Sequence, residues 1–287
     1  MTFDLRDGEW LEDNRASWDE RVGVHLASDF YDQAPLRAGG GVLDPITRGG
    51  LQRLYPDGLE GVRVLHLQCH FGSDSLSLAN LGATVVGIDF SPAAVAEARR
   101  MADELDLSHR TRFIEANVYD ARHMLPEPES FDLVFVTWGT IIWLPDIAEW
   151  ARIVSWFLKP GGRLYFAEGH PAAMVFEGAD GADGMPTFTY GYSNDAPDVI
   201  DDPGDYADPQ AVLENSRTWE WTHPIDEVMR AVRDAGLDVE SYTEGYSVPW
   251  QAFPVLVPLG DGMFGWPATR WLPLSYELVA TAPAPTR

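Results

Sequence analysis

Apolar runs of strand length alternate with amphipathic stretches through the middle of the chain. The expected strands are 62–67, 84–89, 111–114, 131–136 and 163–168. The expected helices are 73–81, 92–105 and 146–158. Buried strands are short and apolar, whereas amphipathic helices repeat their apolar positions every three or four residues. Regular alternation of the two predicts a parallel sheet with helices on its faces.

Two helices have clear start or end signals. Ser91 precedes Pro92, and a serine N-cap followed by proline in the first turn is a typical helix start. The segment 223–237 has helical spacing and closes on Gly236, a residue suited to end a helix. Two further strands are expected after it, in LDVESYTEGYS and in SYELVATA (275–282). We expect both to extend the same sheet.

The pattern divides the chain into four parts. They are an N-terminal helical segment at 1–60, a core at 61–170, an insert at 171–222 and a C-terminal part at 223–287. The insert is rich in Asp, Gly and Pro with interspersed aromatic residues, and connections this long are more often functional than plain linkers. We expect it to form a cap in which RTWEW (217–221) pairs with TFTYGY (187–192). The C-terminal part completes the sheet and carries a second aromatic insert.

The stretch from 62 to 90 predicts half of a nucleotide-binding site. It reads as a strand, a tight turn, an amphipathic helix and a second strand that ends in Asp89. Asp89 follows Gly72 at a spacing typical of a carboxylate that accepts hydrogen bonds from ribose hydroxyls. The turn itself carries bulky residues at 68–71 and a single glycine. A ligand without a phosphate bridge therefore suits this turn better.

Several motifs resemble those of the class I S-adenosylmethionine-dependent methyltransferases. LQCHFGSDSLSLA resembles the first motif, with His66 at the usual acidic position and with Gln68 and His70 in place of two glycines. This Cys-His-Phe-Gly version is similar to that of a bacterial subgroup that acts on small molecules. The other similar segments are NRASWDERVGVHLASDFYD, VVGIDFS, FIEANVYDA, FDLVFVTWGTIIWLPD, LKPGGRLYFAEGHP and SYELVATA.

The resemblance implies a fold, a cofactor and a reaction. The implied fold is α/β: a doubly wound, Rossmann-like sheet of seven strands with the last strand antiparallel, an N-terminal helical lid and an inserted cap. The implied cofactor is S-adenosyl-L-methionine. The implied reaction is transfer of its methyl group to oxygen, nitrogen or carbon of a compact small-molecule acceptor, with aromatic metabolites among the options.

We expect eleven residues at the cofactor. Ligands of doubly wound sheets bind beyond the carboxyl ends of the strands, which selects the ends of four predicted strands. Asp89 is expected at the ribose, the N–H groups from Ser73 onward at the carboxylate, Phe90 under the adenine and Asn117 at its edge. Core packing of Phe90, a turn-stabilising Asn117 and a capping Asp89 are the alternatives. The full set is Trp18, Tyr31, Gln68, His70, Gly72, Ser73, Asp89, Phe90, Asn117, Val118 and Thr137.

Trp18 and Tyr31 enter this set as a lid. Aromatic faces suit a sulfonium cation by the same electrostatics that suit an ammonium ion. Aromatic residues at helical spacing more often pack into a core, so that alternative stays open. His25, in the same segment, is expected to be structural.

The candidate catalytic residues are two histidines. The cofactor activates the methyl group, so the protein supplies alignment and water exclusion, and a base only if the acceptor must lose a proton. His170, beside Glu168 at the end of a strand, is the first candidate because an imidazole titrates near neutral pH. His223 is the second. A structural role is the alternative for both.

Aromatic residues are dense after the fourth predicted strand and in the later inserts. An aromatic-walled pocket suits a flat or hydrophobic small molecule, although packing on the sheet is the alternative for most of them. We expect several to line one cavity next to His170. The residues expected at the acceptor are Trp138, Glu168, Tyr190, Trp219 and Trp250.

The net charge of −25 argues against some partners. A polyanion or an anionic membrane would be repelled, and no basic stripe appears in the sequence, so nucleic acid and membranes are not expected as targets. Apolar runs stay short of a membrane span and the N-terminus lacks the features of a signal peptide. We therefore expect a cytoplasmic protein, with a homodimer among its options for assembly.

The single cysteine and its neighbours are assigned structural roles. Cys69 cannot form a disulfide within the chain, which fits a reduced compartment. His66 and His70 are expected to order the turn. No metal site is expected, because Cys69 and His70 are adjacent and lack the spacing of metal ligands.

Two other functions compete with methyl transfer. An NAD(P)-dependent oxidoreductase with a Rossmann fold also uses a strand, a turn and an acidic residue, but it needs a glycine-rich phosphate turn that this chain lacks. A catalytically silent protein that binds S-adenosylmethionine is the second, since the first motif departs from the usual pattern. Measuring which cofactor binds distinguishes the oxidoreductase from a methyltransferase. Measuring turnover distinguishes the catalytically silent protein from a methyltransferase.

Overall fold

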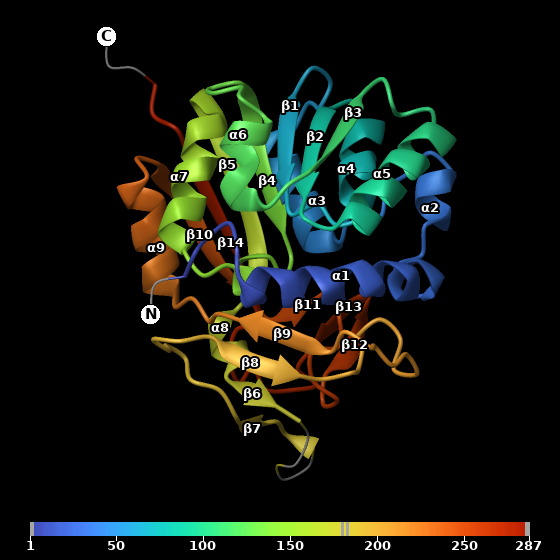
Figure 1. Ribbon diagram of the computed structural model, residues 1–287, viewed down its shortest axis with the longest axis vertical. Helices are drawn as coiled ribbons and strands as arrows, with labels where there is room; N and C mark the ends of the chain where they lie inside the picture. The colour runs from blue at the N-terminus through green and yellow to red at the C-terminus, as the bar shows by residue number, and fades with distance from the viewer. Residues whose placement is uncertain (1–2, 179–180, 182–183, 285–287) are drawn as a thin grey trace.

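A computed structural model describes residues 3–178, 181 and 184–284, and its main sheet confirms the predicted α/β class. The seven strands of this sheet are β1 (Arg63–Leu67), β2 (Thr84–Asp89), β3 (Thr111–Glu115), β4 (Phe131–Thr137), β5 (Leu158–Gly169), β10 (Asp238–Gly245) and β14 (Ser275–Thr281). Their order is β10-β14-β5-β4-β1-β2-β3 (Figure 1). The last strand, β14, runs antiparallel to both of its neighbours, β5 and β10, as expected.

The order of the strands reverses beside β1. The chain runs outward from β1 through β2 to β3, then returns to place β4 on the other side of β1. Both neighbours of β1 are parallel to it. Connections that leave in opposite directions open a crevice beyond the carboxyl ends of β1 and β4, and this crevice is where open α/β sheets bind ligands.

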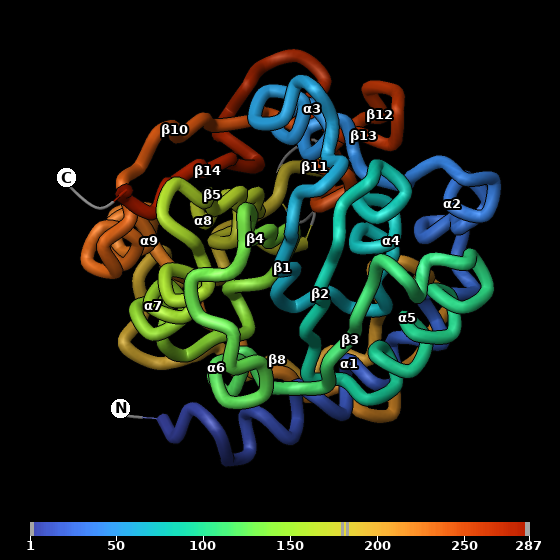
Figure 2. Tube along the Cα trace, turned by 90° about the horizontal axis from the view of Figure 1, so that it is seen from above, coloured from blue at the N-terminus to red at the C-terminus, as the bar shows by residue number. Residues whose placement is uncertain are grey.

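Helices cover both faces of the sheet (Figure 2). One face carries α3 (Pro45–Leu54), α4 (Ser73–Asn80) and α5 (Pro92–Glu104); the other carries α6 (Ala121–Met124), α7 (Ile147–Phe157) and α9 (Ile225–Asp234). Side chains such as Leu76 and Val95 fill the first interface, whereas Trp150 and Phe157 fill the second. Burial of these large apolar side chains drives the layered packing.

The start and end signals of the helices are confirmed. Ser91 Oγ accepts the Ala94 N–H at 3.0 Å and so caps α5. Asp44 Oδ1 accepts two N–H groups at the start of α3, where Pro45 occupies the first helical position. Gly236, with φ of +84°, follows α9. Each signal works because it satisfies an N–H that the helix leaves free, or supplies a left-handed turn.

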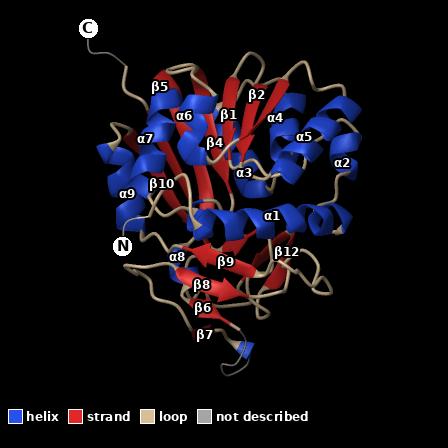
Figure 3. Cartoon of the chain, viewed as in Figure 1, coloured by secondary structure: helices blue, strands red, loops and turns tan. Residues whose placement is uncertain are grey.

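The remaining elements lie at the carboxyl ends of the strands. Helix α1 (Glu9–Ala27) crosses there, and small sheets lie on its far side (Figure 3). These elements are α8 (Pro171–Met174), β6 (Phe176–Glu177), β7 (Thr187–Phe188), β8 (Asp198–Asp201), β9 (Arg217–Glu220), β11 (Ser247–Val248), β12 (Val257–Gly260), β13 (Met263–Gly265) and two 3-10 turns, Val118–Asp120 and Ile141–Trp143. Helix α2 (Ala34–Arg37) instead packs beside α4. Every helix in the described part of the chain is too short or too polar to cross a membrane.

The pairing expected within the insert is wrong. Strand β9 pairs with β8, and β7 pairs with β6, so RTWEW and TFTYGY are not partners. In this pairing Val199 lies opposite Trp219 and Ile200 lies opposite Thr218. Asn14 of α1 then holds β9 through both its amide nitrogen and its amide oxygen, on the backbone of Trp219. Part of the expected cap, at 179–180 and 182–183, lies outside the described residues.

Gly72 lies in the turn after β1, where neighbouring side chains leave little room for a larger residue. It adopts φ of +80°, and an added Cβ would lie 2.8 Å from the Phe113 ring and 2.9 Å from the Ala98 methyl group. Gly72→Ala should lower the free energy of unfolding by about 2–5 kcal/mol, since overpacking adds to left-handed strain. Gly161→Ala is the matched control, because Gly161 has φ of +78° and open space around it. Urea denaturation should show the larger loss at Gly72; equal losses would contradict the steric argument.

Candidate functional site

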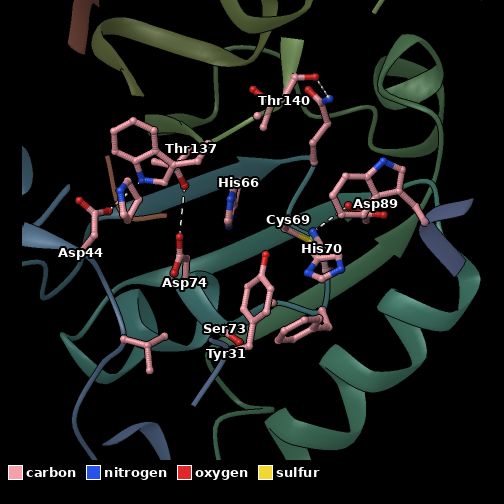
Figure 4. A pocket seen from close by; sticks show the side chains of 18 of the residues that line it. Tyr31, Asp44, His66, Cys69, His70, Ser73, Asp74, Asp89, Thr137 and Thr140 are labelled. Carbon is pink, nitrogen blue, oxygen red and sulfur yellow. Dashed lines mark hydrogen bonds between the residues drawn. The ribbon is translucent and has the colours of Figure 1, made fainter. Parts of the chain in front are cut away.

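A cavity of about 700 Å³ lies beyond the carboxyl ends of β1, β2 and β4. The turns after these strands form its floor, as Figure 4 shows. Its walls come from α1, from the segment 30–48 and from residues of both inserts, among them Met174, Tyr206 and Trp250. The cavity therefore occupies the crevice that the reversal of strand order creates.

The turn after β1 contains three residues in the left-handed region. Gln68 has φ of +56°, His70 has +50° and Gly72 has +80°. A left-handed conformation costs a non-glycine residue about 1–2 kcal/mol, so the surroundings must hold Gln68 and His70 in place. Gln68 Nε2 donates to the Thr140 carbonyl at 2.7 Å, and the His70 N–H donates to Asp89 Oδ2 at 2.7 Å. The backbone thus makes the close turn of a glycine-rich motif with other residues.

Asp89 ends β2 with its carboxylate on the cavity. Besides the His70 N–H, the Ser91 N–H donates to it at 3.0 Å. Burial outweighs these hydrogen bonds and raises the pKa of Asp89 to about 6. The carboxylate is held in one orientation and has remaining acceptor sites for a ligand.

Asn117 follows β3 at the same side of the cavity. Its Oδ1 accepts the Tyr119 N–H at 3.1 Å, and its Nδ2 donates to the Leu5 carbonyl at 2.8 Å. The amide therefore stabilises the turn and ties it to the N-terminal segment. We call Asp89, Phe90, Asn117 and Val118, all on the cavity wall, the β2–β3 half of the site.

The opposite side of the cavity carries two aspartates and two tryptophans. Asp74 Oδ2 accepts the Thr137 hydroxyl at 3.2 Å, and Asp44 Oδ2 accepts the Trp138 indole N–H at 2.9 Å. The rings of Trp138 and Trp250 meet edge to face with centroids 5.8 Å apart. Burial and the neighbouring Asp44 charge raise the pKa of Asp74 to about 7. We call these five residues the β4 half.

His66 lies between the two halves (Figure 4). Its Nδ1 is 2.8 Å from the Ser75 hydroxyl oxygen, and its ring is only 2% exposed. Burial lowers the pKa of His66 to about 3, so the imidazole is neutral near pH 7.

Aromatic rings close the cavity from the N-terminal segment. Trp18 meets His70 edge to face at 5.3 Å between centroids, and the Tyr31 hydroxyl is 2.5 Å from the Tyr206 hydroxyl of the first insert. Tyr31 and Tyr206 both line the cavity. Two segments separated by 175 positions thus meet over the site.

A cluster of charged side chains stabilises the contact between the N-terminal segment and the first insert. Asp205 Oδ2 lies 2.7 Å from Arg21 Nη1 and 3.1 Å from His25 Nε2. Burial alone would raise the pKa of Asp205, but His25 and Arg21 lower it to about 2. Sequence reasoning missed Asp205, since nothing in the Asp-rich insert distinguishes it from its neighbours.

The comparisons with known proteins agree with this geometry. Residues 64–162 match the family model of a methyltransferase domain. Over these residues the chain carries a methyltransferase domain, and the family expected from the motifs is confirmed at the level of that domain. The Cys-His-Phe-Gly subgroup remains a prediction.

Curated relatives match the methyltransferase domain over part of their length. A ubiquinone biosynthesis O-methyltransferase from Ralstonia nicotianae is 32% identical over 134 residues, which are 47% of this chain and 53% of that protein. One from Pseudomonas fluorescens is 32% identical over 123 residues, 42% of this chain and 50% of that protein. The chain spans about half the length of these two relatives.

Solved structures share the fold. An S-adenosylmethionine-dependent methyltransferase from Mesorhizobium loti aligns with a TM-score of 0.55 and 19% identity, over 81% of this chain and 96% of that one. The glycopeptide N-methyltransferase MtfA, complexed with S-adenosylmethionine, aligns with a TM-score of 0.54 and 18% identity, over 85% and 95%. At these identities the likeness supports the fold of the methyltransferase domain.

The structure brings thirteen of the predicted site residues to the cavity. All eleven residues expected at the cofactor line it, as do Trp138 and Trp250 from the set expected at the acceptor. The five that do not line it are His170, His223, Glu168, Tyr190 and Trp219.

The placement of both histidines favours the structural alternative for each of the two candidate bases. His170 caps α8, where its Nδ1 accepts the Ala172 N–H at 3.1 Å. His223 is buried, with its Nε2 2.8 Å from the Leu144 carbonyl oxygen. Neither imidazole reaches the cavity, so the expected cavity next to His170 is wrong.

Glu168, Tyr190 and Trp219 serve packing and hydrogen bonding. The Glu168 carboxylate accepts the N–H groups of Gly139, Thr140 and Gly169 at 2.5–2.8 Å and so holds the loop after β4. The Tyr190 hydroxyl donates to Glu177, and the Trp219 indole donates to Asp13 at 2.8 Å. Glu168 acts on the cavity through the loop that it positions.

Asp44 and Asp74 are among the cavity residues that sequence reasoning missed. Asp44 precedes Pro45 as a helix cap, and Asp74 stands in the first turn of α4 after Gly72. Both positions have an ordinary structural explanation. Their convergence depends on the packing of α3 and α4 on the same face of the sheet.

Asp74 should destabilise the fold at high pH. Its pKa rises from 3.8 to about 7 on folding, so the penalty begins above the lower value and is complete above the higher one. Asp74→Asn removes it and should raise the melting temperature by several degrees at pH 8, and by less at pH 5. Asp226→Asn, on an exposed part of α9, is the matched control and should change little at either pH. A gain that is equal at pH 5 and pH 8 would contradict the assignment.

Proposed function

We propose that this chain transfers a methyl group from S-adenosylmethionine to a small-molecule acceptor. The observation that carries the proposal is one cavity with two chemically different halves on either side of β1. The β2–β3 half offers the Asp89 carboxylate, and the β4 half offers Asp44 and Asp74 beside two indole rings. One half suits a nucleoside and the other suits a second ligand.

The residues around the first half fit the cofactor. Asp89 would accept hydrogen bonds from the ribose hydroxyls, and the free N–H groups at the start of α4 would face the carboxylate. Phe90 and Val118 would border the adenine. When bound, S-adenosylmethionine supplies a methyl group activated on a sulfonium.

The acceptor is compact because the cavity is limited. Pockets of about 300–1,000 Å³ hold one drug-sized ligand, and here about 700 Å³ must hold both molecules. Trp18, Tyr31 and Tyr206 line one wall, and Trp138 and Trp250 line another. The relatives leave the acceptor atom open, since two are O-methyltransferases and MtfA is an N-methyltransferase.

Asp74 is the group placed to take a proton from the acceptor. It borders the cavity, and its pKa of about 7 lies near neutral pH, where a general base works best. The titratable groups that face it are Asp44, the neutral His66 and Tyr31, whose pKa is raised well above its ordinary value by burial.

Cofactor binding tests the nucleoside half. S-adenosylhomocysteine should bind in a calorimetric titration and NADH should not; the reverse would favour an oxidoreductase.

Asp89→Ala should weaken binding of S-adenosylhomocysteine by about 1–3 kcal/mol, because it removes acceptors for the ribose. Glu115→Ala is the matched control, since Glu115 pairs with Asp89 across the sheet but is exposed. Unchanged affinity in Asp89→Ala would refute the role of this carboxylate.

Methyl transfer tests the proposed base. The protein would be incubated with S-adenosylmethionine labelled in its methyl group and an extract of small metabolites. Label should enter the extract, at a rate that falls as the pH drops below about 7 and Asp74 becomes protonated. Asp74→Asn should slow transfer about 100-fold or more, whereas His170→Ala should leave it within a few-fold. No transfer at all would favour a catalytically silent protein that binds the cofactor. Slow methyl transfer by His170→Ala would instead support His170 as the base.

A further inference from the structure

The described residues that line the cavity carry strongly negative charge. Their side chains include five aspartates and a single arginine, Arg48, which is exposed. Asp89 belongs to the β2–β3 half, which leaves Asp44 and Asp74 in the β4 half. No lysine or arginine within the described residues forms a salt bridge with either of them. Both carboxylates are half-buried, and the Asp44 charge acts on Asp74, so together they favour a cation between or beside them.

Two of the three side-chain hydrogen-bond donors of the β4 half are already used, and the Trp250 indole N–H is the third. The Thr137 hydroxyl donates to Asp74, and the Trp138 indole donates to Asp44. Gln68, at the boundary of the half, donates to the Thr140 carbonyl. A ligand that needs donors, such as a carboxylate or a phenolate, therefore finds little to bind.

Acceptors remain available in the same place. Asp74 uses one oxygen for Thr137, and its other oxygen has no hydrogen bond to a described residue. His66 is 98% buried and lines the cavity; its Nδ1 faces Ser75, and its Nε2 has no hydrogen bond to a described residue. In the neutral tautomer whose Nδ1–H donates to Ser75 Oγ, Nε2 is a hydrogen-bond acceptor. The half is therefore built to receive donors.

Two aromatic faces adjoin these acceptors. Trp138 reaches Asp44 through its indole nitrogen and packs edge to face against Trp250. Indole rings attract cations through their electron-rich faces, and the attraction adds to that of nearby carboxylates. Carboxylates combined with indoles are typical of sites for ammonium groups.

We propose that the acceptor is an amine, bound as an ammonium ion in the β4 half and methylated on its nitrogen. This inference rests on the proposed methyl transfer and narrows its acceptor class. Trp138 and Trp250 border the organic part, and Asp44 and Asp74 attract the charged end. Asp74 and His66 accept its N–H groups.

The reaction balances with the groups present. The ammonium first gives one proton to the Asp74 carboxylate, which frees the nitrogen lone pair. The nitrogen then bonds to the methyl carbon as the carbon–sulfur bond breaks, and that electron pair stays on the sulfur. The products are a methylated ammonium, S-adenosylhomocysteine and a protonated Asp74, which returns its proton to solvent when the site opens.

Three probes of one shape test the charge preference. They are 2-phenylethylamine, 2-phenylethanol and 3-phenylpropionate, which are cationic, neutral and anionic at pH 7.5. Each would be titrated calorimetrically into the protein saturated with S-adenosylhomocysteine. The amine should bind at least 10-fold more tightly than the alcohol, and the anion should not bind measurably. An amine that binds no better than the alcohol, or not at all, overturns the proposal.

The variant Asp74→Asn tests whether the preference for the amine depends on the Asp74 carboxylate. Asp74→Asn should reduce the ratio of amine to alcohol affinity at least 5-fold and leave binding of S-adenosylhomocysteine unchanged. Asp226→Asn changes the net charge equally on an exposed helix and should keep the ratio. A preference that survives Asp74→Asn overturns the proposal, and if that variant does not fold the three probes decide on the unaltered protein. Failure to bind S-adenosylhomocysteine would instead overturn the proposed methyl transfer.

Discussion

The hydrogen bond from the His70 N–H to Asp89 joins the ends of β1 and β2, and the site depends on it. It requires the chain to turn sharply after β1, which it does through left-handed residues at Gln68, His70 and Gly72. Glycine would adopt this conformation without strain, whereas Gln68 and His70 need anchors. The Thr140 carbonyl anchors the first, and aromatic packing against Trp18 surrounds the second. The same contacts that relieve strain also shape the cavity wall.

Electrostatics then divides the cavity. On the β2 side, Asp89 is fixed by two backbone N–H groups and remains an acceptor. On the β4 side, Asp44 is fully hydrogen-bonded while Asp74 keeps an oxygen free. Burial without a compensating cation raises the pKa of Asp74, and such a group is poised either to bind a cation or to take a proton. The large negative charge of the whole chain, −25, reinforces this preference for cations over anions.

Distant segments close the site by polar contacts between them. The Asp205 cluster joins the insert to α1, and the Tyr31–Tyr206 contact lies over the cavity. Asn14 holds β9 against the same helix. Glu168, which sequence reasoning placed at the acceptor, instead anchors the loop that carries Trp138 through its neighbour Gly139. Residues outside the cavity therefore decide its shape.

The sequence by itself determined the sheet, its helices and the positions of Asp89 and Gly72, because these follow from local periodicity, capping and turn chemistry. The reversal of strand order also follows from the family motifs. Only the tertiary structure decided which polar groups share the cavity. Asp44 and Asp74 read locally as ordinary helix-start residues, and His170 reads as a base at a strand end. Tertiary packing places the two aspartates on the cavity and keeps His170 away from it, because the direction of a side chain depends on neighbours far away in the chain.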